Sequence, residues 1–416
     1  DGQFHIVNEL EVEEYLKGVV PNEMPIRFGL EALKAQSVAA RNYVLSPRIK
    51  LNPNYDVVDS VASQVYFGAN TEKELSNQAV KETEGIVALY GWDLILAQYS
   101  STAGGWSESF ENTFSDVKTK AFPSESKPYL IAKPDYEDFG PLDTEDKVIE
   151  FYKSRPKSFD EKSPYFRWER EWSAQEIQDA IQSNIVNQSA TGFITPTVNS
   201  GDEIGTIKSL NVIKRGLSGK IMELEIQTDK QNYIVQKELT IRRLLTNNGK
   251  ALPSANVVFE HEYDKDNNLV KIKAYGGGYG HGVGMSQYGA GGMAKEGYTF
   301  DEIFRHYYSD TTIDLLPLEL SSDGDKNTAV YDFYLTKKQA KIVVENKEND
   351  IELKVVINGK EFNFKAEANK DKKYVVDISK YVKLGDNKIY FFYPLEDNEN
   401  KSVKVFIELY GDRNDN

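Results

Sequence analysis

The stretch GGGYGHGVGMSQYGAGG, residues 276–292, contains nine of the 29 glycines in the chain of 416 residues. Each glycine inside a regular helix or strand costs about 0.5–1 kcal/mol relative to alanine. Nine of them would cancel much of a domain's net stability of about 5–15 kcal/mol. The spacing fits neither the dinucleotide-binding nor the P-loop pattern, and a flexible linker would not interleave Tyr279, His281 and Tyr288. We therefore predict an ordered backbone that closely approaches a ligand or another element and then enters a helix over 285–297.

The composition excludes several classes of function. The chain has 50 Lys and Arg against 65 Asp and Glu, a formal charge of −15, which disfavours binding to nucleic acid. It has no Cys and four His, and no H-E-x-x-H spacing, so we expect no metal and no cofactor. The chain contains no run of about 18 apolar residues, so no transmembrane segment is predicted. The N-terminus lacks the features of a signal peptide, so we expect any targeting segment upstream of Asp1.

Periodicity predicts a mixture of helices and antiparallel strands. Apolar and small residues recur at helical spacing over 12–20 and 30–45, and a helix is also expected over 144–153. Two apolar runs, 86–90 and 94–101, read as a hairpin that turns at Gly91. The segment FRWEREW (166–172) and a helix over 173–182 follow, and alternating runs at 204–215 and 221–228 read as a second hairpin. The fold class is therefore α+β.

The composition changes after residue 320. Short alternating runs extend from Val330 to Leu409, with turns at INGK (357–360) and LGDNK (384–388). We predict a mixed helix and antiparallel-sheet domain over 1–320, with a surface excursion over about 120–165, and an all-β sandwich over 325–416. The sandwich has two open interpretations, as a carbohydrate- or wall-binding module and as a packing or partner domain.

Glu23 is the most unusual carboxyl group in the sequence. It lies between Pro21 and Pro25, in the apolar stretch VVPNEMPIRFG (19–29). Burial raises the pKa of a carboxyl group, which allows the group to act as a general acid near neutral pH. The alternative is that Glu23 merely begins the next helix. Glu108 and Glu111 are rival or partner acids.

Three motifs occur in a fixed order along the chain. They are EEYLKGVVPNEMP with LEALKAQSVAARNYVL (13–45), YSSTAGGWSESFENTF (99–114), and the segment from Tyr279 to Ile313 that begins YGHGVGMSQYG. Together they resemble the stage II sporulation protein D and amidase-enhancer family of bacterial cell-wall proteins. The resemblance covers Gln3 to Ile313 and leaves the predicted sandwich outside.

The resemblance implies a lytic transglycosylase that cleaves peptidoglycan strands stripped of their peptides. The catalytic glutamate of the family falls on Glu23, which would protonate the bond between N-acetylmuramic acid and N-acetylglucosamine and leave a 1,6-anhydro end. The implied substrate-binding residues are Lys34, Gln36, Arg41, Ser101, Thr102, Glu108, His281, Ser286, Gln287 and Tyr288. On this view the glycine segment and the segment around Ser101 form opposite walls of a sugar groove.

Each of these assignments has an alternative. Lys34 and Arg41 are seven residues apart, so they either orient Glu23 and grip substrate or form a solvated ion-pairing face. His281 is either a ligand contact or a structural histidine, and Trp106 is either part of the groove or core. Some family members hold zinc near YSSTAGG, but this chain has no His or Cys there.

The resemblance also implies an extracytoplasmic protein that binds glycan strands. A cell-wall amidase and other wall or sporulation proteins are the implied partners. Two alternatives to the enzyme stay open: a non-catalytic wall-binding protein that stimulates an amidase, and a structural protein whose glycine loop packs internally.

Overall fold

The computed structural model describes residues 6–46, 54–136, 140, 142, 144–321, 327–345, 350–369, 373–393 and 402–410. The chain forms two compact units. The first contains Asp1–Ala97, Tyr298–Arg305 and Asp310–Asn416, and the second contains Gln98–Gly297 and His306–Ser309. Two parts of the sequence predictions fall outside the described residues. They are residues 1–5, which lack the features of a signal peptide, and residues 137–139, 141 and 143 of the predicted excursion.

The first unit begins with helices that pack around one alanine-rich helix. The helices are α1 (Val12–Glu23), η1 (Ile26–Phe28), α2 (Leu30–Leu45), η2 (Ala69–Thr71) and α3 (Glu74–Glu82). Helix α2 contacts α1, α3 and β1. It is therefore buried continuously from Ala32 to Asn42, and not along the single stripe that the periodicity predicts, because its small side chains let neighbours approach from several sides.

A seven-stranded sheet joins the two ends of the chain within the first unit. Its strands are β1 (Ile86–Tyr90), β2 (Asp93–Leu94), β12 (Thr312–Leu315), β13 (Leu318–Ser321), β15 (Lys341–Glu345), β18 (Lys373–Asp377) and β20 (Ser402–Glu408). The predicted turn at Gly91 is confirmed, with φ 63° and Leu89 opposite Leu94. The second strand of that hairpin is shorter than predicted, because Tyr99 and Ser100 pair in a different sheet.

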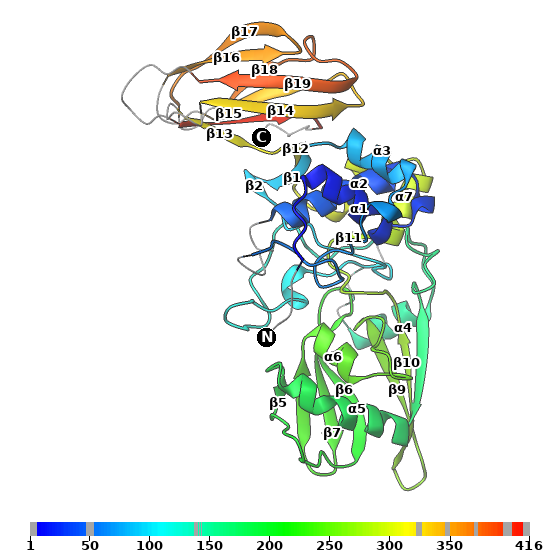
Figure 1. The fold of residues 1–416 in the computed structure, drawn as a ribbon. Helices are drawn as coiled ribbons and strands as arrows, with labels where there is room; N and C mark the ends of the chain where they lie inside the picture. The colour runs from blue at the N-terminus through cyan, green and yellow to red at the C-terminus, as the bar shows by residue number, and fades with distance from the viewer. Residues whose placement is uncertain are drawn as a thin grey trace. The chain divides into compact units, whose positions relative to one another are not determined.

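The predicted strand-rich C-terminal region is also confirmed (Figure 1). Strands β14 (Thr328–Leu335), β16 (Ile351–Ile357), β17 (Lys360–Ala366) and β19 (Gly385–Phe392) form a four-stranded sheet. The hydroxyl of Tyr331 on β14 donates to the carbonyl of Leu316 and lies 3.4 Å from the carbonyl of Val405 on β20, so β14 contacts a strand of the seven-stranded sheet. Because β20 also pairs with β12, and β12 with β1, the strands after residue 325 extend a sheet that begins near residue 86.

The second unit is built from two larger antiparallel sheets and a small parallel pair. Strands β4 (Trp168–Ser173), β10 (Leu269–Gly276) and β9 (Val257–Tyr263) form one sheet, and β5 (Ile194–Thr195), β8 (Asn232–Gln236), β7 (Ile221–Thr228) and β6 (Ile207–Arg215) form another. Strands β3 (Tyr99–Ser100) and β11 (Met285–Ser286) are the parallel pair. The helical segments are η3 (Phe110–Asn112), α4 (Glu145–Lys153), α5 (Ala174–Ser189), α6 (Glu238–Leu244) and α7 (Gln287–Lys295); α8 (Phe300–Tyr307) is divided between the units.

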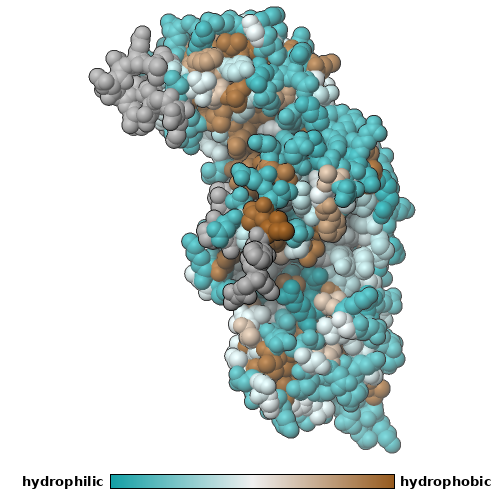
Figure 2. Space-filling view, viewed as in Figure 1, coloured by the Kyte–Doolittle hydropathy of each residue, from teal (hydrophilic) through white to brown (hydrophobic). Residues whose placement is uncertain are grey.

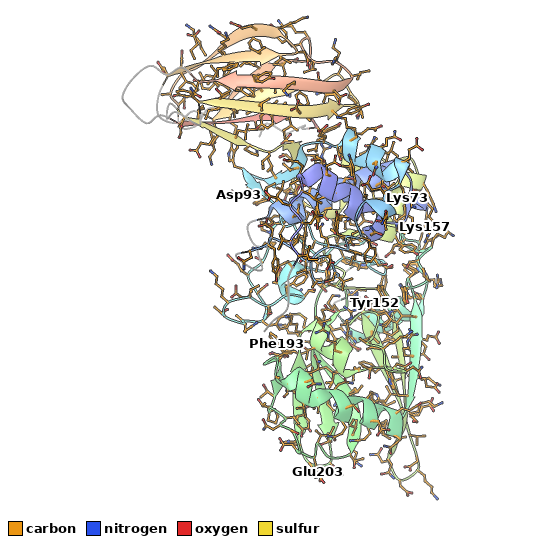
Figure 3. All side chains as sticks on the ribbon, in the orientation of Figure 1. Lys73, Asp93, Tyr152, Lys157, Phe193 and Glu203 are labelled. Carbon is orange, nitrogen blue, oxygen red and sulfur yellow. The ribbon has the colours of Figure 1, made fainter. Side chains whose placement is uncertain are left out.

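The core of the second unit lies between α5 and the sheets. Ile177, Ile181 and Ile185 recur every four residues along α5 and are fully buried, and Ser173 and Glu176 form a capping box at its start. Tyr152 lies among the packed side chains, whereas Glu203 lies at an outer edge (Figure 3).

The segment 120–165 is not only a surface excursion. It contributes Leu130, Phe151 and Asp160 to the buried interior, so this expectation is corrected. The predicted helix within it is confirmed as α4, which Thr144 caps.

The face of the molecule drawn in Figure 2 is largely hydrophilic, with small scattered apolar patches. Within the described ranges, no helix is both long enough and apolar enough to cross a bilayer.

Candidate functional site

Glu23 ends helix α1 in a half-buried position within the first unit. Its Oε1 accepts a hydrogen bond of 2.7 Å from the backbone N–H of Val65. Burial, and then the charge of Glu23, raises the pKa of the nearby Tyr15 and Tyr43 hydroxyls. The carboxyl group is therefore held in place beside two phenols that stay neutral, and it does not extend into bulk solvent.

The segment 64–71 forms one side of this site. The ring of Tyr66 packs on Gly18, where a Cβ would overlap it. Asn22 donates to Thr71 Oγ1 at 2.7 Å, and Tyr15 donates to Gln64 Oε1 at 3.2 Å. The sequence analysis did not identify this segment. The spacing of Tyr15, Gly18 and Asn22 contained the signal, because it places a glycine and two polar side chains on one face of α1.

Lys34 and Arg41 bind carboxylates other than Glu23. Lys34 Nζ lies 2.8 Å from Glu31 and 2.6 Å from Glu82. Arg41 donates to both oxygens of Glu13, at 2.7 and 2.6 Å, and to the carbonyl of Ile86 at 2.9 Å. The ion pairing of the alternative interpretation is therefore confirmed, but its solvated face is wrong, because both cations are at least 95% buried.

These two cations join α1, α3 and β1 to helix α2. They do not orient Glu23 as predicted. Gln36, the third candidate on α2, is also completely buried.

The glycine segment of the second unit is ordered, as predicted, but its glycines approach protein and not a ligand. Gly278, Gly280, Gly282 and Gly284 alternate with larger residues, and all have φ between 69° and 104°. A Cβ on Gly284 would overlap the carbonyl oxygen of Gln98, and one on Gly104 would lie 2.7 Å from the backbone of residue 277. These contacts support the alternative in which the loop packs internally.

The segments expected to form opposite walls of a groove are paired directly. Tyr99 and Ser100 pair with Met285 and Ser286 in parallel strands, and Thr102 and Tyr279 exchange two backbone hydrogen bonds of 3.2 and 2.8 Å. No sugar chain fits between two backbones that are bonded to each other. The prediction of a groove between these segments is therefore wrong.

His281 has the features of a structural histidine. Its Nδ1 accepts a hydrogen bond from the backbone N–H of Val283 at 3.1 Å, and its ring contacts Phe114. Burial lowers its pKa to about 4, and a hydrogen bond with the backbone of Tyr99 only partly opposes this. The ring is neutral at physiological pH, so it supplies no positive charge for an anionic substrate.

Most of the other candidates in this unit are buried. Glu108 is 0% exposed and accepts hydrogen bonds from Asn112 and from the backbone and side chain of Ser218. Thr102 bonds the Ser163 hydroxyl, and Ser286 caps α7. Gln287 and Trp106 are both 7% exposed, and Trp106 belongs to a core cluster. Glu108, Thr102 and Ser286 have structural roles, and their predicted substrate contacts do not fit this burial.

Three residues near the paired segments do reach the surface. Tyr279 is 43% exposed and its ring lies 4.4 Å from that of Tyr165, between centroids. Ser101 and Tyr288 are half-buried, and the backbone N–H of Tyr288 donates to the carbonyl of Ser101. The contact of Ser101 and Tyr288 with substrate stays a prediction.

A buried pair of carboxyl groups supports the paired segments. Asp160 Oδ2 accepts the backbone N–H of Gly104 at 2.7 Å. The Ser158 hydroxyl lies 2.8 Å from Asp135 Oδ2 and 2.7 Å from Asp160 Oδ1. A hydroxyl group has one proton, so Ser158 can donate to only one of these carboxyl groups and can bond the other only by accepting a hydrogen bond from its protonated form. Burial, and then the charge of Asp135, raises the pKa of Asp160 to about 7, so Asp160 holds the shared proton.

Neither the motif nor its surroundings fit a zinc ion. Residues 99–105 have only hydroxyl, methyl and hydrogen side chains, none of which is a usual zinc ligand. Across the described part of the chain, no three His, Cys, Asp or Glu side chains converge to hold a metal ion.

Comparison with known proteins identifies the family. A model described as stage II sporulation protein matches residues 1–90, and a domain of unknown function matches 115–284. The amidase enhancer of Bacillus subtilis (strain 168) is 33% identical over 302 residues, which is 72% of this chain and 40% of that protein. Stage II sporulation protein D of the same organism is 30% identical over 323 residues, which is 74% of this chain and 75% of the relative. The chain belongs to the stage II sporulation protein D and amidase-enhancer family, as its motifs suggested.

The chain spans only about 40% of the length of the amidase enhancer. Among solved structures, a cycloalternan-forming enzyme from Listeria monocytogenes aligns with 14% identity and a TM-score of 0.18, over 36% of this chain and 15% of that one. A similarity this small carries no argument about function.

The close approach at Gly284 predicts a large loss of stability on substitution. Gly284→Ala combines a left-handed backbone with an overlap at Gln98, and should lower the free energy of unfolding by about 3 kcal/mol. Gly297→Ala is the matched control, because Gly297 has φ +93° but open space around it, and should cost about 1–2 kcal/mol. Urea unfolding measures both. Equal losses would contradict internal packing as the reason for Gly284.

The raised pKa of Asp160 predicts that stability falls as pH rises. Between about pH 4 and pH 7 the folded protein keeps a proton that the unfolded chain has released, so the free energy of unfolding should decrease by about 2–3 kcal/mol from pH 5 to pH 8. Asp160→Asn should remove this component, whereas Asp266→Asn, on an exposed turn, should retain it. Denaturant titrations at several pH values measure the effect, and an unchanged pH dependence in Asp160→Asn would refute the assignment.

Proposed function

We propose that this protein cleaves the glycan strands of peptidoglycan as a lytic transglycosylase, with Glu23 as its general acid and base. The observation that carries the proposal is the position of the Glu23 carboxyl group, half-buried and held by the Val65 N–H within the segment that matches the family model. A positioned carboxyl group beside neutral phenols has the geometry that proton transfer requires.

One carboxyl group is enough for this reaction. The Glu23 acid gives its proton to the oxygen between N-acetylmuramic acid and N-acetylglucosamine, and the bond from that oxygen to C1 breaks. The Glu23 carboxylate then takes the proton of the muramic 6-hydroxyl while O6 bonds to C1. The product is a 1,6-anhydro ring, and the proton has returned to Glu23.

The neighbouring carboxylates fit a mechanism of this kind. A glycosidase that uses two carboxylates places them about 5–9.5 Å apart and requires both to be available. Here Glu31 and Glu82 are bound to Lys34, and Glu13 is bound to Arg41. These three carboxylates of the first unit are therefore engaged in ion pairs and are not available as a second catalytic group.

Replacing Glu23 should abolish cleavage without unfolding the protein. Glu23→Gln keeps the size and the hydrogen bond from Val65 but cannot transfer the proton, so the yield of anhydro product should fall at least about 100-fold. Mass spectrometry of denuded glycan strands measures the product. Glu14→Gln is the control, because Glu14 lies on the same helix in a largely exposed pair with Lys17. Unchanged product from Glu23→Gln, or none from the unaltered protein between pH 5 and pH 8, would defeat the proposal.

A second candidate is a non-catalytic protein that binds the wall and stimulates an amidase. It is favoured by the relative named amidase enhancer, which is 33% identical. In this case Glu23→Gln should stimulate a purified N-acetylmuramoyl-L-alanine amidase as well as the unaltered protein does. Both candidates place the protein outside the cytoplasm, where glycan strands and amidases meet.

A further inference from the structure

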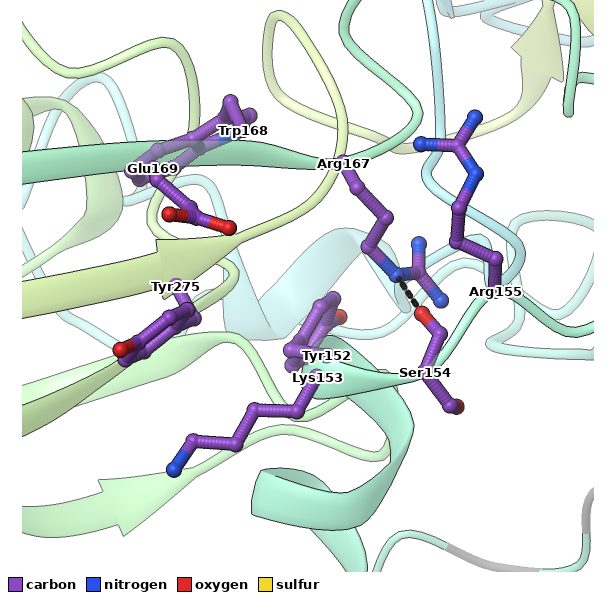
Figure 4. A pocket seen from close by; sticks show the side chains of 8 residues that line it. All are labelled: Tyr152, Lys153, Ser154, Arg155, Arg167, Trp168, Glu169 and Tyr275. Atoms are coloured by element: carbon purple, nitrogen blue, oxygen red, sulfur yellow. Dashed lines mark hydrogen bonds between the residues drawn. The ribbon is translucent and has the colours of Figure 1, made fainter.

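The second unit contains a pocket of about 560 Å³ that the catalytic proposal does not use (Figure 4). It combines three cations, three aromatic rings, a serine and one carboxylate. Its lining residues are Tyr152, Lys153, Ser154, Arg155, Arg167, Trp168, Glu169 and Tyr275. All of them come from the end of α4, the start of β4 and the end of β10, so the pocket lies within one unit.

Two of the cations form no salt bridge with a carboxylate of the described residues. Lys153 is paired with Glu260 beside the ring of Tyr275. By contrast, neither Arg155 nor Arg167 forms a salt bridge with any carboxylate of the described residues; Arg155 has only a 3.4 Å contact with the carbonyl of Glu161 and a ring contact with Phe166. Asp160 favours the charged form of Arg167 without forming a salt bridge with it, whereas Arg155 disfavours that form. An anion bound at the two guanidinium groups would offset their repulsion.

Arg167 is fixed in place as a permanent positive charge. It donates to the backbone carbonyls of Ser154, Gly104, Phe166 and Phe151 at 2.8, 2.9, 2.7 and 3.0 Å, and it lies over the ring of Phe166. A guanidinium has five N–H donors, so one is left for a ligand. Burial lowers the pKa of Arg167 to about 10; Tyr152 and Asp160 partly oppose this shift, and the charge of Arg155 adds to it. Arg167 therefore stays charged at neutral pH, and its orientation requires no further ordering when a ligand binds.

Arg155 supplies the exposed half of the site. Its side chain is exposed, and its planar fork of donors matches the two oxygens of a carboxylate or phosphate. In Figure 4 the two arginines lie on one side of the pocket, and Tyr275 and Lys153 lie toward the other, with Tyr152 between them. The half-buried ring of Tyr275 offers an apolar surface for a sugar ring, and the exposed Glu169 can accept hydrogen bonds from hydroxyl groups.

We propose that this pocket binds an anionic saccharide unit of the cell wall, with its carboxylate or phosphate at Arg155 and Arg167 and its polyol part toward Tyr275 and Glu169. The choice of a wall saccharide rests on the proposed function, whereas the anion site rests on the two arginines. The carboxylate source is the lactyl group of N-acetylmuramic acid. The phosphate source is a polyol phosphate.

Ligand-observed NMR titration of the full chain at low ionic strength tests the pocket. The probes are N-acetylmuramic acid, its neutral counterpart N-acetylglucosamine, and glycerol phosphate. We expect at least one anionic probe to bind about ten- to a hundred-fold more tightly than N-acetylglucosamine, because a charged hydrogen-bonded pair contributes that much. Arg155→Gln should remove the difference. Lys162→Gln, an equal loss of charge at an 81% exposed side chain outside the pocket, should retain it.

Each outcome decides the proposal. Tighter binding of N-acetylmuramic acid, or of glycerol phosphate alone, supports it and identifies the source of the anion. Equal binding of charged and neutral probes, or a preference that survives Arg155→Gln, overturns it. Glu23→Gln should bind the probes as the unaltered protein does, so a failure of cleavage and a failure of this pocket are separate results.

Discussion

The second unit depends on a contact between two backbones that leaves no room for side chains. Residues 277–284 lie against 98–104 so closely that a Cβ at Gly278 would be 2.9 Å from the carbonyl oxygens of Thr102 and Ala103. The contact leaves buried backbone N–H groups that need hydrogen-bond acceptors. The side chains of Glu108, Ser286 and Asp160 accept hydrogen bonds from such groups. The polar residues that look like a site in the sequence are largely the supports of this contact.

The same contact is connected to the pocket by a chain of buried polar groups. Lys220, completely buried below Gly282, donates to Asn256, and Asn256 donates to the hydroxyl of Tyr152. Tyr152 in turn donates to the carbonyl of Ser218, whose side chain bonds Glu108. A change in the glycine segment can therefore alter the position of Tyr152, which lines the pocket, without contact with a ligand. The reason is that every group in such a network is costly to leave unpaired.

The sequence was sufficient for features that depend on neighbouring residues. Periodicity correctly predicted α1, α2, α4 and α5, and Gly91 and the Asn358–Gly359 turn marked hairpins that exist. It was not sufficient where distant segments meet. Nine glycines indicate close approach, but they do not say to what, and the spacing of Lys34 and Arg41 does not reveal that Glu82 and Glu13 are their partners. Arg155 and Arg167 were missed because only the fold brings them into one pocket.

Buried ion pairs also determine how substitutions in this protein should be interpreted. Removing one partner of a buried pair costs about 3–5 kcal/mol, a large part of a total stability of about 5–15 kcal/mol. Loss of activity on replacing Lys34 or Arg41 would therefore reflect a weakened helix core and not a lost substrate contact. Glu23 is different, because it is half-buried at the end of a helix and glutamine can keep its bond to Val65. Among the candidate residues of the first unit, it is the one at which activity and stability can be separated.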